Sequence, residues 1–562
     1  MAPKDRIRGD GSTKSTLNIH QVRVQEDDQQ HNNPTADISD GEGTVAPRKP
    51  LAFYLSFIGI CFSALVCALD ATSLGVAIPS IAEQLGGTTL QSFWASIAYL
   101  LCVVTTQPLY TAVSDVFGRK PPLYLAYAFF AAGSLVFALA GNMPAVIAGR
   151  VLQGLGGGGM DVLGEIVVAD MTTLRERPVY LGVKALPMAV GSILGPTMGA
   201  LFSSFASWRW IGWVNLPLLG VAAPLVFFFL RLRPADTAPL GDKLARLDWG
   251  GAALALAGTT ALVLPLSWAG TLYPWRSWQT LLPLVSGLAL LAAFGAYEAR
   301  PAHPIVPHRV LRSRTAAATL VGNFAHGAML FALLQYLPLF FQAVALETPI
   351  RSAVLLLPTS AASVAAAVAG VIAVGLVGRG YKWALRATWA VTAAGAGLLA
   401  LLGPESSRPA QMGVPVVWGI GIGALMRLLH LPMQASVPSV DDTGAAIGVS
   451  LAVRLLGGLI GLAIGSTVFS SVFASSIAAV SELPGSLSIL RDANQAIGFI
   501  PTLRTLDIPH GELTPVLDAY LEAMRAIFYT MTGFGAAGFA SSLFTEELTL
   551  NKTERGRQAF ED

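Results

Sequence analysis

Charged residues are scarce in this sequence. Lys, Arg, Asp and Glu make up 12% of its 562 residues, against about 25% in an average soluble protein, and 53% of the residues are hydrophobic. The formal net charge of +2 is nearly neutral and is spread over many short segments, so no continuous basic surface for nucleic acid is expected. This composition is typical of a chain whose main surroundings are lipid.

Cysteine is also rare, which limits the chemistry to be expected. Cys61, Cys67 and Cys102 all lie in apolar runs, and this placement favours packing as small hydrophobic side chains over disulfides. No group of His, Cys and carboxylate residues has the spacing of metal ligands, so neither a metal site nor a cofactor is predicted. Residues 1–50 lack apolar runs and are predicted to form a disordered cytoplasmic tail, not a signal peptide.

Long apolar runs recur from Leu51 to Phe544. Each has the roughly 20 residues that an α-helix needs to cross a hydrocarbon core about 30 Å thick. An all-α polytopic membrane protein with about fourteen transmembrane helices is therefore predicted. The predicted spans are 53–81, 91–112, 122–141, 144–169, 179–204, 209–231, 248–268, 279–298, 316–343, 352–375, 384–403, 413–437, 446–474 and 524–546.

The positive charges of the short loops predict the orientation. Alternate loops are rich in Lys and Arg, such as Arg119 with Lys120 and Arg379 with Lys382, and positive loops tend to stay cytoplasmic. The segment 475–523 is net acidic and is predicted to be an extracellular loop. The domains expected are a bundle of six helices at 51–231, two extra helices with linkers at 232–315, a second bundle at 316–546, and a cytoplasmic tail at 547–562.

Charged side chains inside a span are candidates for function, because each costs at least ~2.5–3.5 kcal/mol at the bilayer centre on insertion scales. Asp70 lies in the first span. A carboxylate in a low-dielectric cavity holds its proton more tightly than one in water, so Asp70 is predicted to exchange protons. A static hydrogen-bonding role is the alternative.

The fourth span carries a polar stripe. At about 100° per residue, Asp161 returns to within ~20° of Arg150, with Gln153 and Glu165 about 60° to either side. A cation beside carboxylates can tune their proton affinity, so Arg150, Asp161 and Glu165 are predicted to share in proton coupling. A buried structural ion pair is the alternative.

The later spans contain a second polar set, which predicts the lining of a substrate cavity. For a lone histidine such as His326, a packing role is the alternative. With Gln153 of the fourth span, the predicted cavity residues are Asn323, His326, Gln335, Arg427 and His430, and Arg454 lies close by in the thirteenth span.

Two ladders of glycines at four-residue spacing indicate close helix packing and an internal repeat. If spans seven and eight are an insertion, each ladder belongs to the fifth helix of its half, and transporters built from repeats bind substrate between the halves. The first ladder consists of Gly191, Gly195 and Gly199, and the second ladder of Gly457, Gly461 and Gly465.

Several motifs now make a family recognisable. The segment SDVFGRK at 114–120, RVLQG at 150–154 and GSILGPTMG at 191–199 resemble motifs of the major facilitator superfamily, and specifically of its fourteen-span drug:proton antiporter branch, which includes fungal toxin and multidrug efflux pumps. The resemblance covers roughly residues 50–546. It implies a charge network that latches the halves, with Asp115, Gly118 and Arg119, and an antiporter motif in the fifth span that includes Pro196.

The resemblance implies export of a small lipophilic compound, such as a toxin, secondary metabolite or drug, in exchange for protons by alternating access. A monomer in the plasma membrane is expected, with the vacuolar membrane as the alternative. Uptake of siderophores or other small molecules is a competing function. An intramembrane enzyme is disfavoured, since the one adjacent carboxylate pair, Asp441 and Asp442, has no partner cluster.

Overall fold

The computed structural model describes residues 49–172, 177–232, 248–269, 272–300, 308–377, 380–437, 443–480, 483, 485–506 and 508–548. The predicted tails at 1–50 and 547–562 lie almost wholly outside these residues. The described residues form helices and no strand; one isolated bridge joins Ala269 to Tyr273. An all-helical chain suits a membrane because each α-helix satisfies its backbone hydrogen bonds internally.

The first half of the chain, residues 51–229, forms one helical bundle. Two of its helices begin where polar side chains cap the backbone: Thr88 and Gln91 make reciprocal hydrogen bonds at the start of α2, and Asn142 accepts from Ala145 N at the start of α4. The helices are α1 (Leu51–Leu85), α2 (Thr89–Phe117), α3 (Lys120–Ala138), α4 (Met143–Met171), α5 (Arg177–Phe205), α6 (Trp210–Trp213) and α7 (Asn215–Phe229).

Two helices follow, α9 (Trp249–Trp268) and α10 (Trp278–Tyr297), and after a short 3-10 turn, η1 (His308–Leu311), comes the second half, residues 314–543. The helices of the second half are α11 (Arg314–Ala343), α12 (Pro349–Val377), α13 (Tyr381–Leu399), α14 (Arg408–Leu428), α15 (His430–Ser436), α16 (Thr443–Ala478), η3 (Gly485–Arg491), η4 (Ala493–Gln495), α17 (Ile500–Leu503) and α18 (His510–Leu543).

Each of the fourteen predicted spans overlaps a long helical segment. Within the described residues, twelve segments are long and apolar enough to cross a membrane. The helices α13, which carries Lys382 and Arg386, and α18 do not meet that criterion, yet they lie at the predicted spans 384–403 and 524–546 and pack with the second half. The polytopic helical fold predicted from the sequence is therefore confirmed.

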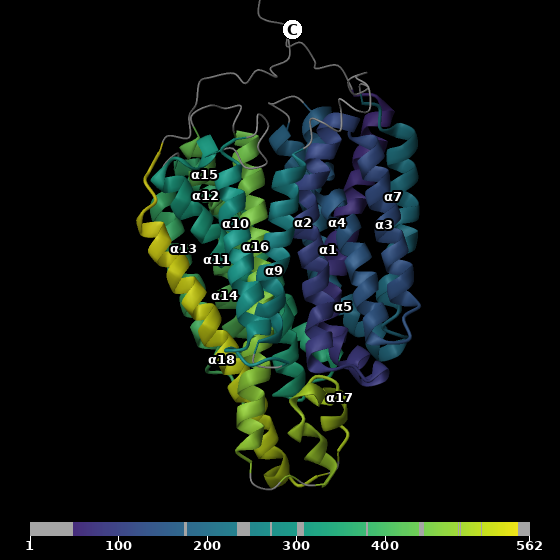
Figure 1. Ribbon diagram of the computed structural model, residues 1–562, viewed down its shortest axis with the longest axis vertical. Coiled ribbons are helices and arrows are strands. Elements are labelled where there is room, and N and C mark those ends of the chain that lie inside the picture. Colours follow the sequence, from purple (N-terminus) through teal and green to yellow (C-terminus); the bar gives the residue numbers. More distant parts are fainter. Residues whose placement is uncertain are drawn as a thin grey trace, which may run out of the picture. The chain divides into compact units, whose positions relative to one another are not determined.

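The two halves pack in the same order. In the first half α1 packs against α5 and α7, and α4 packs against α2 and α3. In the second half α11 packs against α16 and α18, and α14 packs against α12 and α13. Figure 1 shows the two groups of helices standing next to each other. This match supports the internal repeat that the glycine ladders indicated.

The run of glycines in the fourth span lies inside one unbroken helix, α4. A Cβ at Gly156 would lie 2.5 Å from the Phe130 backbone nitrogen on α3, and a Cβ at Gly159 would lie 2.7 Å from the Tyr110 ring on α2. Side chains at these positions would push the helices apart. The run therefore serves the close packing of α4 between α2 and α3.

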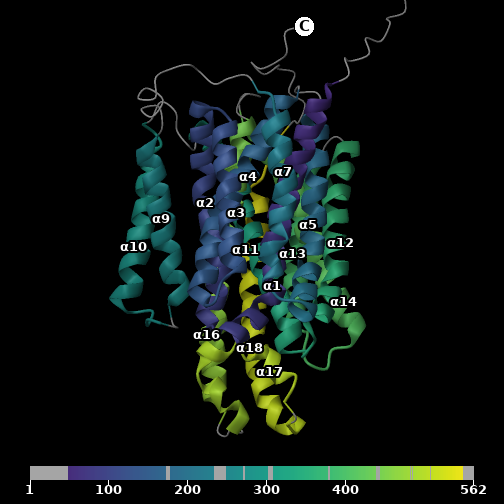
Figure 2. The ribbon, with the colours of Figure 1, turned by 90° about the vertical axis from the view of Figure 1, so that its right-hand side faces the viewer.

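The halves meet mainly where α2 packs on α16 and α5 on α12, and α1 also contacts α11. Near the end that carries residues 485–506, the Phe93 ring of α2 packs at an angle against the rings of Tyr336 and Phe469, and Gln342 donates to the Val76 carbonyl. The hairpin of α9 and α10 lies outside both bundles, where α9 contacts α2 and α16 (Figure 2). The extra helices are thus an addition beside the interface.

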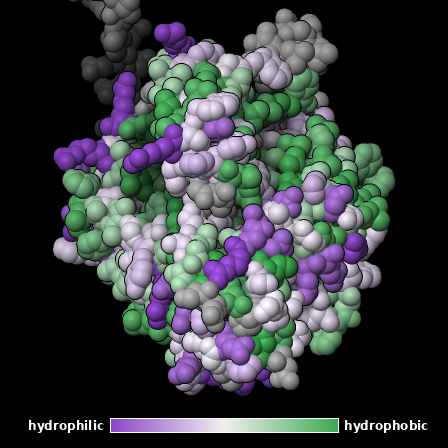
Figure 3. All heavy atoms as spheres, turned by 60° about the horizontal axis from the view of Figure 1, so that its bottom comes forward, coloured by the Kyte–Doolittle hydropathy of each residue, from purple (hydrophilic) through white to green (hydrophobic). Residues whose placement is uncertain are grey.

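The predicted extracellular loop 475–523 is partly helical in the structure. The segment 475–523 was expected to be a loop, but α16 continues to Ala478 and α18 begins at His510. Hydropathy misses the first turns of α18 because they are amphipathic: Leu513 and Val516 are buried, whereas Glu512 is exposed. Figure 3 views this end, where hydrophilic residues lie mixed with apolar ones.

Candidate functional site

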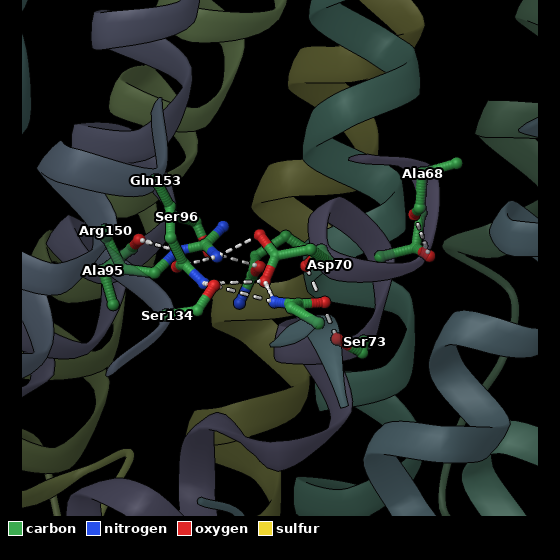
Figure 4. A network of polar contacts seen from close by, with 11 residues as sticks. Ala68, Asp70, Ser73, Ala95, Ser96, Ser134, Arg150 and Gln153 are labelled. Atoms are coloured by element: carbon green, nitrogen blue, oxygen red, sulfur yellow. Dashed lines mark hydrogen bonds and ion pairs between the residues drawn. The ribbon is translucent and has the colours of Figure 1, made fainter. Parts of the chain in front are cut away.

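A buried ion pair occupies the middle of the first half. Asp70 of α1 is fully buried, and its Oδ2 lies 2.5 Å from Nη1 of Arg150 on α4, which is 1% exposed (Figure 4). Burying one charge without the other would be strongly unfavourable, so the pair ties α1 to α4. The sequence placed both residues among the candidates but did not reveal that they touch.

Amides complete the shell around this carboxylate. Gln153 Nε2 donates to Asp70 Oδ1 at 3.1 Å, and Asn215 Nδ2 of α7 donates to the same oxygen at 2.9 Å. Both amides also donate to Ser134 Oγ on α3, and Gln153 Oε1 accepts from Arg150. Sequence reasoning missed the roles of Asn215 and Ser134, although an amide inside an apolar span was an available signal.

Arg150 has contacts on its other side as well. Its Nε donates to the Ala95 carbonyl of α2 at 3.1 Å, and its guanidinium lies 4.2 Å from the centre of the Tyr99 ring. Planar cations stack favourably on aromatic faces. The guanidinium is thus held by three helices in one orientation.

A cavity lies between the halves, directly beside Arg150. Ser96 of α2 donates to Gln335 Oε1 of α11 across it, so the predicted cavity residue Gln335 does line a cavity. The wall is otherwise mainly apolar. Its lining residues are Ala71, Thr72, Gly75, Ser96, Tyr99, Leu100, Arg150, Phe331, Leu334, Gln335 and Leu462.

The polar stripe predicted on α4 is divided into two separate networks. Asp161 accepts from Gln107 Nε2 at 2.9 Å, and among the described residues no hydrogen bond or ion pair joins it to Arg150. Eleven residues of helix separate the two along the axis by about 16 Å, at 1.5 Å per residue, so they cannot share a partner although they point the same way. The residues of the predicted stripe thus belong to one helix but to two networks.

A lysine completes the second network. Lys184 of α5 is 6% exposed, and its Nζ lies 3.8 Å from Glu165 Oε1 and donates to the Asp161 backbone carbonyl at 3.4 Å. Glu165 keeps 46% of its side chain exposed. Lys184 was missed in the sequence, although a lysine within the predicted span 179–204 was a sufficient signal.

The second half has a cationic group at its centre. Arg454 of α16 is 4% exposed, and its Nη2 donates to Asn323 Oδ1 at 3.0 Å and to the Met426 carbonyl at 3.1 Å. The same nitrogen lies 3.3 Å from His430 Nε2. Arg427, one turn before His430, is exposed.

Three of the predicted cavity residues are buried between helices and do not line the described cavity. Gln153, Asn323 and His326 are each 0% exposed. His326 Nε2 bonds to the Ile422 carbonyl of α14, which favours the packing role left open for it. Polar side chains that find partners in neighbouring helices are held there, because leaving those partners unpaired in an apolar interior is costly.

The latch motif is only partly described. Gly118 ends α2 with φ 86°, a backbone angle that favours glycine, and Arg119 Nε lies 2.9 Å from Asp170 Oδ2 at the end of α4. The side chain of Asp115 lies outside the described residues. Asp170 is a partner that the sequence did not suggest.

Both glycine ladders lie at close helix contacts. In the first ladder, Gly191 packs against α1, where a Cβ would lie 2.8 Å from the Leu65 carbonyl oxygen. In the second ladder, Gly461 packs against α11, where a Cβ would lie 2.5 Å from the Ala328 carbonyl oxygen. Gly195 and Gly199 likewise face α1, and Pro196 between them is buried. The backbones of paired helices meet in both halves.

Among the described residues, no group of three His, Cys, Asp or Glu side chains could hold a metal ion. The adjacent carboxylates Asp441 and Asp442 lie outside the described residues.

Comparison with known proteins gives consistent results. A model of the Major Facilitator Superfamily matches residues 60–462. The MFS-type transporter sphD of Aspergillus fumigatus is 54% identical over 527 residues, which cover 93% of this chain and 91% of that protein. The efflux pump FUS6 of Gibberella moniliformis is 33% identical over 524 residues, which cover 92% of each.

A solved structure supports the fold. A bacterial homologue of the human lysosomal transporter Spinster, in an inward-facing and occupied conformation, aligns with a TM-score of 0.60 over 89% of this chain and 97% of that one. The sequence identity is 15%, so this likeness bears on the fold alone.

Proposed function

The chain belongs to the major facilitator superfamily, and from that premise we propose that it is a proton-coupled antiporter that exports a small lipophilic compound. Its relatives include fungal transporters and efflux pumps, so the chain is a small-molecule transporter of the membrane and not an enzyme. Proton coupling, the direction of transport and the class of substrate are the proposed parts.

One observation carries the proposal. Arg150 is ion-paired with Asp70 and also lines the cavity between the halves. Protonation of Asp70 would remove the negative charge that holds the guanidinium, and Arg150 would then be available to the cavity. Protonation of Asp70 and binding of a substrate therefore both change the contacts of Arg150. Such a coupling between proton and substrate is what an antiporter requires.

The second network is the proposed entry for protons. Glu165 is partly exposed, and Lys184 connects it to the backbone of Asp161. A carboxylate that is open to water and beside a lysine can exchange its proton with the solvent. Asp161 and Glu165 would then pass the proton along α4 towards Asp70.

The arrangement of the halves fits one state of alternating access. Their contacts gather near residues 485–506, where Thr89 of α2 donates to the Ala493 carbonyl and Thr502 donates to Glu83. The sequence predicts that this end is extracellular. Together these contacts and the predicted orientation support a state closed to the outside, as expected for a carrier that is about to take up a cytoplasmic compound.

The plasma membrane is the proposed location, with the vacuolar membrane as the alternative, and a monomer is the proposed form. Uptake of siderophores or another small molecule is the competing function. The antiporter-like motif at 191–199, which packs α5 on α1, favours export.

The decisive experiment uses purified protein in liposomes with an imposed pH gradient. Two dyes of opposite charge, rhodamine 6G and fluorescein, are offered, so the test does not depend on the charge of the substrate. We expect saturable, gradient-driven flux of at least one dye, and we expect Asp70→Asn to abolish it, because an amide cannot take up and release the proton.

The matched control is Glu405→Gln, which neutralises an exposed carboxylate in the loop between α13 and α14 and should leave flux unchanged. Unchanged flux in Asp70→Asn would remove Asp70 from the coupling mechanism. Flux of either dye that ignores the pH gradient would contradict proton coupling.

A further inference from the structure

We infer that Arg454, His430 and Arg427 bind the anionic group of the transported compound, so that the substrate is an amphipathic organic anion. The inference rests on the transport function proposed above and adds the chemical class of the cargo. It concerns the second half, where no role in proton coupling was assigned.

The three side chains lead from the protein interior to an exposed position. Arg454 is buried, His430 is half-buried and lies 3.3 Å from Arg454 Nη2, and Arg427 is exposed. The charges of Arg427 and Arg454 both act on His430. Three nitrogen-bearing side chains thus share one region between α11, α14, α15 and α16.

The described helices of this region supply no counter-charge. The six helices from α11 to α16 contain no Asp or Glu. In the described part of the chain, no carboxylate lies within ion-pair distance of Arg427 or Arg454; the charge of Glu165, from the other half, reaches Arg454 from farther away. A buried cation without a counter-ion is unfavourable unless something else supplies one.

Hydrogen-bonding capacity is also left over in this region. Arg454 Nε and His430 Nδ1 are buried and have no partner in the structure. Buried polar atoms are normally paired, so unpaired ones call for an explanation. A carboxylate, sulfate or phosphate group would accept from the guanidinium and from the imidazole when its nitrogen carries a proton.

The apolar wall of the cavity lies at a fixed distance from this region. Phe331 follows Asn323 by eight residues on α11, and Leu462 follows Arg454 by eight residues on α16, which is about 12 Å along each helix at 1.5 Å per residue. Along both helices, the residues near the cationic group therefore come first and the residues of the apolar wall follow. The matching ligand has an anionic group about 12 Å from an apolar body.

A purely structural role for Arg454 does not explain the whole group. Its hydrogen bonds to Asn323 and to the Met426 carbonyl do join α16 to α11 and to α14. Arg427 is exposed and makes no such bond among the described residues, yet it adds a second positive charge where repulsion is unfavourable. An anion that lies between the two arginines would remove this repulsion.

The test measures binding to the full-length protein in detergent, at equal pH throughout. The probes are dodecanoic acid carrying a boron-dipyrromethene fluorophore, its methyl ester, and the matching primary amine, each followed by fluorescence anisotropy against empty micelles. We expect the acid to bind at least about tenfold more tightly than the ester or the amine, as one charge-assisted hydrogen bond provides.

Variants then locate the site. Arg427→Gln and Arg454→Gln should each weaken binding of the acid about tenfold and leave binding of the ester unchanged. The matched control, Arg408→Gln, removes an exposed cation at the other end of α14 and should change neither. Because Arg427 is exposed, the Arg427→Gln variant should fold. It therefore tests the inference even where Arg454→Gln does not fold.

Two results would overturn the inference: equal binding of the acid, ester and amine, or an unchanged affinity for the acid in Arg427→Gln. Its failure is separable from failure of the proposed antiport, because binding is measured without a pH gradient. A preference for the acid without gradient-driven flux would keep the anion site and reject proton coupling.

Discussion

In the first half α5 packs on α1 through the first ladder, and in the second half α16 packs on α11 through the second ladder. The charges buried within these equivalent packings differ. The first half buries a carboxylate, Asp70, paired with Arg150, and a lysine, Lys184, beside Glu165. The second half buries Arg454 among neutral partners.

On the functions proposed above, this difference would give the two halves different tasks. Proton exchange needs carboxylates, which the membrane-embedded helices of the first half supply and α11 to α16 lack. Recognition of an anion needs cations that are not already neutralised, which the second half supplies. The two halves thus share their packing and differ in their buried charges.

The largest expected effect tests the charge difference directly. Arg150→Leu leaves the Asp70 carboxylate buried without its cation and should lower the free energy of unfolding by about 3–5 kcal/mol. Arg454→Leu leaves only neutral acceptors unpaired and should cost less, about 1–3 kcal/mol. Thermal unfolding in detergent measures both.

A double variant serves as the control for that comparison. Asp70→Asn combined with Arg150→Leu removes both charges and should recover part of the stability lost in Arg150→Leu. Two results would contradict the proposed difference between the halves. One is a double variant that is no more stable than Arg150→Leu, and the other is a larger loss of stability in Arg454→Leu than in Arg150→Leu.

The sequence predicted the polytopic helical fold and the positions of the long helices because hydropathy depends on composition alone, which a membrane constrains strongly. It also identified Asp70 and Arg150, since charges are rare enough in spans to be noticed singly. The sequence did not predict contacts that depend on which helices pack together. A helical wheel gives the direction of Asp161 around α4, but its partner, Gln107, depends on which helix lies there and at what height.

The same limit explains the cavity residues. Asn323 and His326 were selected because they are polar residues within a span, and both are buried between helices. Polarity indicates that a side chain must find partners, but it does not tell whether those partners are protein groups or a ligand. Arg427 and Gln335, which are exposed or line a cavity, share the same sequence signal.

The second prediction tests whether the packing really is equivalent in the two halves. Gly191→Ala and Gly461→Ala each place a methyl group against a facing backbone carbonyl, so each should lower the free energy of unfolding by about 1–3 kcal/mol. Similar losses, measured by thermal unfolding, would support duplicated packing with divergent charges.

Each helix offers its own control for these glycines. A Cβ at Gly182 of α5 or at Gly448 of α16 would meet nothing within 4 Å, so alanine there should be neutral or slightly stabilising through its better helix propensity. If only one ladder is sensitive, the halves differ in packing as well as in charge, and the argument for simple duplication fails.

The smallest effect compares the ends of α3 and α13, which hold equivalent places in the two halves. Arg119 makes an ion pair with Asp170, with side chains 22% and 35% exposed, whereas Arg386 donates to the Ser542 and Leu543 carbonyls at the end of α18. Asp170→Asn should lower the free energy of unfolding by about 0.2–1 kcal/mol in low salt. In 1 M salt, where the Debye length falls to about 3 Å, this loss should disappear. Arg386→Gln should lower the free energy of unfolding by a similar amount at both salt concentrations because the partners of Arg386 are neutral. Equal salt dependence of the two variants would contradict a charge difference between these two helix ends.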